Sequence, residues 1–132
     1  MAELLVPISP GELIDKITIL EIKSQRMTDA AKLHNVRNEL KLLSDTWRAS
    51  PFSATDISAQ WAGLRDVNAK LWDIEDRIRD KERDGRFDAE FIELARAVYV
   101  TNDERAAIKK QINTKLGSTL VEEKSYAAYR KA

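Results

Sequence analysis

The chain has 132 residues and a balanced charge, because 22 Lys and Arg side chains stand against 22 Asp and Glu side chains. This length suits a single domain, which can bury a core without disulfides or a structural metal. The chain has no cysteine, which excludes thiolate nucleophiles, iron-sulfur clusters and cysteine zinc sites. A protein that neutralises many phosphates normally carries a basic excess, so we expect no nucleic-acid partner.

The N-terminal residues and the hydropathy pattern bear on location. Residues 1–8 include Glu3 and lack the basic start of a signal peptide. No run approaches the roughly 18 apolar residues that a transmembrane helix needs. Together with the absence of cysteine, these features predict a cytoplasmic protein that does not insert into membranes.

The first predicted helix covers about residues 10–27. Its start is marked by Ser9 as N-cap, Pro10 in the first turn and Glu12 at the capping-box position. Its apolar side chains fall on two sides, and Ile19 and Ile22 lie nearly opposite the main stripe. Such a helix either lies between elements of its own chain or carries an oligomer contact. We expect a homodimer whose interface includes Ile19 and Ile22.

Three further helices follow, at about residues 29–48, 56–84 and 89–116. Gly85 and Asp88 punctuate a turn between the last two, and so short a connection requires antiparallel neighbours. The predicted fold is therefore all-α: an antiparallel bundle built around a long helical hairpin and covered by a shorter helical pair. Residues 1–132 form one domain, in which residues 118–132 are a tail or a short terminal helix capped by Thr119 and Glu122.

A polar layer interrupts the apolar seam of the predicted hairpin. Thr101 and Arg105 lie within the apolar stripe of the fourth helix, and antiparallel pairing places Arg105 opposite Asn68. Asn102 lies in the same layer. An unpaired buried guanidinium is so costly that a carboxylate or a bound anion has to answer it. The candidate acids are Glu12, Asp15, Glu39 and Glu75.

This layer has two interpretations. It is either a pocket for an anionic ligand, as helical bundles often build, or a buried ion pair that fixes the helix register. The residues of the pocket hypothesis share a predicted position between the helices; they are Glu12, Asp15, Asn68, Trp72, Glu75, Asn102 and Arg105.

The third helix also carries a row of acids, Asp73, Asp76 and Asp80, which could hold Mg²⁺. Basic residues alternate with them, and pairing between residues three or four apart explains the same pattern without a metal. No phosphate-binding loop or dinucleotide motif is present, and we expect neither a cofactor nor a metal.

Two all-helical enzyme classes offer weak parallels. Glu90 and Glu93 form an E-x-x-E pair similar to that of nucleotide pyrophosphohydrolases, but no second helix supplies the matching acids. Small chorismate mutases clamp a dicarboxylate with cationic side chains, a part that Arg26, Arg37, Arg105 and Lys109 could play. Their spacing does not follow that family's pattern. Whether the protein is an enzyme therefore stays open.

The runs ISPGELIDKITILEIKSQR, LWDIEDRIRD, FIELARAVYVTNDERAAIK and GSTLVEEKSY together resemble a family of short bacterial proteins without an assigned activity. The resemblance spans nearly the whole chain. That family is associated with glycosyltransferases and surface-polysaccharide biosynthesis. It has no established catalytic residues, so the resemblance implies an accessory or binding role near carbohydrate chemistry.

These observations lead to two hypotheses of different kinds. The first is a non-catalytic, cytoplasmic interaction module that self-associates and has a protein partner in glycan biosynthesis. The second is a small-molecule-binding protein, or an enzyme without a cofactor, whose anionic ligand lies on Arg105 between the helices.

Overall fold

The computed structural model describes residues 2–130, which contain four α-helices and one short 3-10 helix. In chain order they are α1 (Pro10–Arg26), α2 (Ala30–Ala49), η1 (Pro51–Ala54), α3 (Ser58–Arg83) and α4 (Ala89–Leu116). No strand occurs among the described residues. The prediction of an all-α fold is confirmed.

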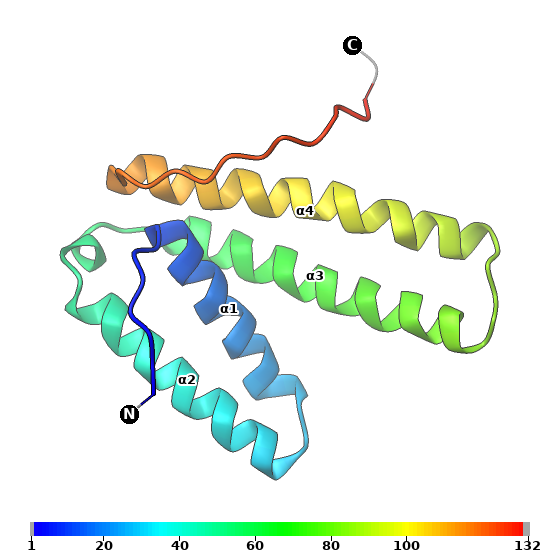
Figure 1. Cartoon of the computed structure of the whole chain (residues 1–132), viewed down its shortest axis with the longest axis horizontal. Helices are drawn as coiled ribbons and strands as arrows, with labels where there is room; N and C mark the ends of the chain where they lie inside the picture. Colours follow the sequence, from blue (N-terminus) through cyan, green and yellow to red (C-terminus); the bar gives the residue numbers. More distant parts are fainter. Residues whose placement is uncertain (1, 131–132) are drawn as a thin grey trace.

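Helices α3 and α4 form the long antiparallel hairpin, and they lie side by side along the longest dimension of the molecule (Figure 1). Gly85 ends α3 in the left-handed conformation, with φ at 65°, which glycine adopts without the cost of a Cβ. Asp88 caps α4 by accepting a hydrogen bond from the backbone N–H of Phe91 at 3.1 Å. The buried Lys81 donates to the same carboxylate at 2.9 Å and so ties the end of α3 to the start of α4.

Helix α1 lies between α2 and the hairpin. It packs against α2 on one side and against both α3 and α4 on the other. Its side chains Ile14 and Ile17 are fully buried with Leu64 of α3 and Ile112 of α4, and these four form the centre of the apolar core. Figure 1 shows that α1 and α2 cover only one end of the hairpin, whose other end extends beyond them.

The position of α1 corrects the predicted dimer interface. Ile22 is only 3% exposed within its own chain, and Ile19 is half-buried. The second apolar side of α1 is therefore largely used inside the molecule, which is the other alternative that its two-sided pattern allowed. Ile22 offers no surface to a second copy.

Helices α1 and α2 both begin at a residue whose side chain caps the first turn. Ser9 accepts from the N–H of Glu12, and Asp29 accepts from the N–H of Lys32. Helix α3 begins at Ser58, two residues after its predicted start at about residue 56, and its N-cap residue Ile57 makes no side-chain cap. Asp56 instead accepts from the N–H of Ser58 at 2.9 Å in the turn just before the helix.

Both ends of the described chain are irregular. Residues 2–8 precede α1 and form neither helix nor strand. Residues 119–129 run back beside α4 and do not form the terminal helix that was the alternative to a tail (Figure 1). The expected cap residue Glu122 is engaged by Lys109 and Lys124. The part of the tail prediction that falls on residues 131 and 132 lies outside the described residues. Within residues 2–130, no helix combines the length and apolar character needed to cross a membrane.

Candidate functional site

The centre of the candidate site is a buried carboxylate that three helices share. Asp15 of α1 is 1% exposed and accepts from Arg105 of α4 through both carboxylate oxygens, with Nε to Oδ1 at 2.8 Å. Asn68 of α3 donates its amide to Asp15 Oδ1 at 2.9 Å. Arg105 and Asn68 thus lie in one layer, and the carboxylate that accepts hydrogen bonds from both comes from α1.

Further hydrogen bonds complete this layer. Asn68 also donates to the hydroxyl of Thr18 at 3.1 Å, and Thr18 in turn donates to the backbone carbonyl of Asp15 at 2.9 Å. The hydrogen bond to Asp15 raises the pKa of Arg105 above its usual range, since the paired guanidinium is favoured in its charged form. A buried carboxylate with a two-point guanidinium partner fixes the register of the helices that carry it.

A second ion pair lies one turn along α4. Lys109, whose side chain is 12% exposed, donates to Glu12 of α1 at 2.7 Å and to Glu122 of the tail at 3.3 Å. Burial is the largest influence on Lys109 and opposes its charge, but the hydrogen bond to Glu12 and the negative charges of Glu12 and Asp15 together outweigh it, so the pKa of Lys109 is raised. The pKa of Glu122 is lowered by its hydrogen bonds from Lys124 and then Lys109. These contacts fasten the tail to the same end of the bundle.

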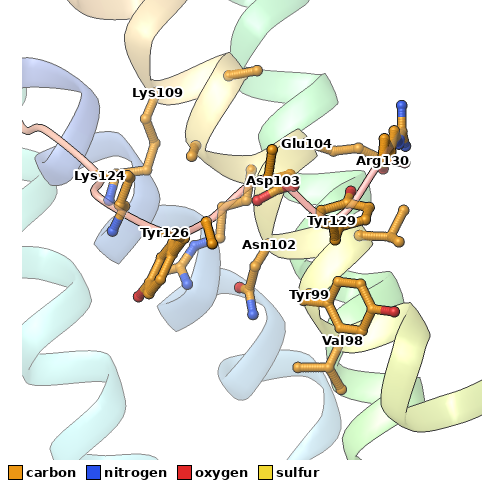
Figure 2. A pocket seen from close by; sticks show the side chains of 16 residues that line it. Val98, Tyr99, Asn102, Asp103, Glu104, Lys109, Lys124, Tyr126, Tyr129 and Arg130 are labelled. Atoms are coloured by element: carbon orange, nitrogen blue, oxygen red, sulfur yellow. The ribbon is translucent and has the colours of Figure 1, made fainter. Parts of the chain in front are cut away.

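The tail and α4 enclose a groove on the outer side of this network (Figure 2). Tyr129 packs edge-on against Tyr99 with ring centroids 4.8 Å apart, and a hydrogen bond with Asp103 raises the pKa of Tyr129. The groove has a volume of about 1120 Å³, larger than a typical enclosed ligand pocket. Its cationic lining residues are Arg105, Lys109, Lys124 and Arg130.

Three predicted site residues lie outside the buried layer. Asn102 is exposed and lines the groove between α4 and the tail. Glu75 accepts from Arg79 at 3.3 Å on an exposed part of α3. Trp72 lies under Arg26 of α1, whose guanidinium carbon is 5.9 Å from the ring centroid. Glu12 joins the layer indirectly through Lys109.

Sequence reasoning missed three polar contacts of this region. Thr18 follows Asp15 by three residues, which places the two on one face of α1 and is a signal that could have been used. Asn113 accepts from the N–H of Gly11 at 2.7 Å, and Glu122 reaches Lys109 from the tail. These two contacts join residues far apart in sequence or in an irregular segment, so helical periodicity gives no signal for them.

Two acids of the α3 row form ion pairs. Asp73 accepts from Arg26 at 2.6 Å and Asp80 accepts from Arg83 at 3.0 Å. No group of three or more carboxylate or histidine side chains is arranged to hold a metal ion among residues 2–130. Asp80 thus pairs with a basic residue three positions away on the same helix, whereas Asp73 pairs with a residue of α1.

Comparison with known proteins gives one match. Residues 4–131 fit the model of a family of unknown function, DUF6165. Neither the curated proteins nor the solved structures contain a match to the chain. Because the family model covers nearly all of the chain, the protein belongs to the family of unknown function DUF6165.

Proposed function

We propose that the protein is a non-catalytic accessory module that acts in the cytoplasm through contacts with a protein of bacterial polysaccharide biosynthesis. The observation that carries this proposal is the N-terminal segment before α1. Leu4 and Leu5 are each 92% exposed and Val6 is 67% exposed, whereas Ile14 and Leu64 at the centre of the core are fully buried. Contiguous exposed apolar side chains mark sites of interaction with other molecules.

The state of the polar layer supports the same function. Asp15 is satisfied by Arg105 and Asn68, so the deepest charged group of the bundle has partners within the chain. A buried pair of this kind orients helices and has no need of a ligand to balance its charge. The class of partner is supported by the resemblance of the chain to proteins associated with glycosyltransferases.

The experiment compares the wild-type chain with Leu4→Asp/Leu5→Asp. Each buried leucine contributes about 1.5–3 kcal/mol to an interface, so the double variant should lose a partner held by this segment. The two proteins are expressed with an affinity tag in the organism of origin, and the co-purified proteins are identified by mass spectrometry. We expect a glycosyltransferase or another polysaccharide-synthesis protein with the wild type and its loss with the variant.

The matched control is Leu42→Asp, which changes another exposed leucine, 51% exposed on α2. Both variants should keep the wild-type melting temperature, because neither position is buried. Partners that are retained by Leu4→Asp/Leu5→Asp, or that have no connection with glycan synthesis, would count against the proposal.

The groove between α4 and the tail favours a second candidate, the binding of a small anionic ligand. Its cationic residues Arg105 and Lys109 lie in adjacent turns of α4. Lys124 approaches Lys109 from the tail (Figure 2). Against this candidate, all three already have carboxylate partners: Asp15 for Arg105, and Glu122 for both lysines. A ligand has to displace Glu122 in order to reach the two lysines.

A further inference from the structure

A second groove runs between α3 and α4, on a surface that α1 does not cover. Its floor contains Ala69 and Ala97 with the buried side chains of Ile74 and Leu94, which are 8% and 6% exposed. Charged residues from both helices form its rims, among them Glu90 and Glu93 of α4. The volume of this groove is about 580 Å³.

The α3 rim of this groove is a row of four charged residues with alternating sign. They occur at spacings of four, three and four residues, which is one stripe of a helix: Asp66, Lys70, Asp73 and Arg77. Asn68, which bonds to α1, lies about 160° around the helix from Asp66 at 3.6 residues per turn. Most of the charged row therefore faces away from the layer that α1 occupies, and Asp73 accepts from Arg26 at the C-terminal end of α1.

The row is complementary to itself in the antiparallel direction. If a two-fold axis passes between residues 71 and 72, Asp66 faces Arg77 of the second copy. Lys70 then faces Asp73 of the second copy, and the symmetry repeats both pairs. All four contacts join opposite charges, whereas a shift by one position of the row would join like charges.

Each charged group can take such a partner without losing its present one. Arg77 uses Nη2 for Glu90, and Asp73 uses Oδ1 for Arg26. Lys70 has only a distant contact with Glu104, at 4.0 Å, and their side chains are about half exposed. The alanines in the floor let a second helix come close, because the distance between packed helices follows the size of the side chains at the contact.

We propose that this groove is the interface of a homodimer, in which α3 of one copy packs antiparallel on α3 of the second copy. This inference rests on the proposed function, in that the chain acts through protein contacts, and it gives the self-association a surface other than Ile19 and Ile22. The row of charges sets the register, and the partly exposed Ala69 and Ala97 of the floor supply apolar contact.

The test uses charge reversal at one pair, Asp66→Lys and Arg77→Glu. Each single variant replaces two opposite-charge contacts in the homodimer by two like-charge contacts. The dimer dissociation constant measured by analytical ultracentrifugation should rise by about tenfold or more in each. An equimolar mixture of the two variants should restore dimers, because every pair is then again of opposite charge.

The double variant separates pairing from folding. Arg77→Glu removes the ion pair with Glu90, and the double variant Asp66→Lys/Arg77→Glu carries the same loss while restoring opposite charges across the interface. It should dimerise as the wild type does. The matched control Asp76→Lys, an exposed reversal on α3 outside the groove, should leave the dissociation constant unchanged.

Two results would overturn this inference: a wild-type chain that stays monomeric at every concentration, or a dimer that both single variants leave intact. A dimer abolished only by Leu4→Asp/Leu5→Asp would place the interface on the N-terminal segment and would also overturn it. A monomeric chain that still captures a polysaccharide-synthesis protein would leave the proposed function standing. A dimer with the expected charge dependence that captures none would contradict that function alone.

Discussion

At the scale of single residues, the two partners of the buried ion pair have unequal surroundings. Asp15 is 1% exposed, whereas the side chain of Arg105 is 29% exposed. If Arg105 is removed, a carboxylate remains without its counter-charge inside the bundle. If Asp15 is neutralised, the guanidinium can turn toward water along its flexible stem. The free energy of unfolding should therefore fall more when Arg105 is replaced than when Asp15 is neutralised.

We accordingly expect Arg105→Met to lower the free energy of unfolding by about 3–5 kcal/mol, since a buried charge is left uncompensated. Asp15→Asn keeps the shape and should cost less, about 1.5–3 kcal/mol, which is the range for hydrogen bonds to charged groups. Urea denaturation followed by tryptophan fluorescence measures both. The control Asp76→Asn, at an exposed position, should stay within about 0.5 kcal/mol of the wild type. Equal losses for the two layer variants would contradict this account.

Much of this layer could be predicted from the sequence. The position of Arg105 in an apolar stripe and the length of the turn around Gly85 together placed it opposite Asn68. The choice among four acids could not be made, because it depends on how α1 is rotated and shifted against the hairpin. That arrangement follows from packing between residues distant in sequence, such as Gly11 with Asn113, and helical periodicity carries no information about it.

At the scale of the elements, the close approach of α1 to α4 depends on Gly11. A Cβ at this position would lie 2.5 Å from the backbone carbonyl oxygen of Lys109 and 2.9 Å from Oδ1 of Asn113. A backbone atom cannot move aside as the end of a side chain can, so the two helices would have to separate. The N–H of Gly11 also donates to Asn113 at 2.7 Å, a contact that requires this proximity.

Gly11→Ala should therefore lower the free energy of unfolding by about 1–3 kcal/mol, as overpacked cores do. Gly63 is the matched comparison, because it is also in a helix but a Cβ there would meet only Ile108 Cδ1 at 3.6 Å, an ordinary contact distance. Gly63→Ala should raise the free energy of unfolding by up to about 1 kcal/mol through helix propensity. Thermal unfolding measured by circular dichroism would show opposite shifts, and a destabilising Gly63→Ala would contradict the assignment.

The helix boundaries were predictable to within about two residues because caps and glycines are local signals. Ser9, Gly85 and Asp88 act where the sequence places them. The path of the tail was not predictable, because the segment from Leu120 to Tyr129 has neither period of regular structure. Its position comes from contacts with distant residues, Glu122 with Lys109 and Tyr129 with Tyr99.

At the scale of the whole molecule, the helices divide their surfaces between internal and external contacts. Helix α1 is enclosed by α2 and the hairpin, and the ion pairs of Asp15 and Glu12 hold it there. The N-terminal segment, the groove of α3 and the groove beside the tail stay accessible. The bundle thus carries three separate accessible surfaces. The function of the protein depends on which of these surfaces bind other molecules.

The melting temperature in the presence of small anions distinguishes a protein-binding function from a ligand-binding function of the groove beside the tail. A ligand that binds only the folded state raises the melting temperature as its concentration exceeds Kd. The proposed accessory role predicts no such rise with sugar nucleotides, other nucleotides or dicarboxylates. The second candidate predicts a rise with an anion, and a larger one in Glu122→Gln, because the anion then no longer competes with the tail carboxylate for Lys109 and Lys124.

Lys124→Glu should abolish that rise, whereas Lys110→Glu, an exposed reversal on α4 outside the groove, should leave it intact. A shift that Glu122→Gln enhances and Lys124→Glu removes would establish the groove as a ligand site and contradict the purely protein-binding function.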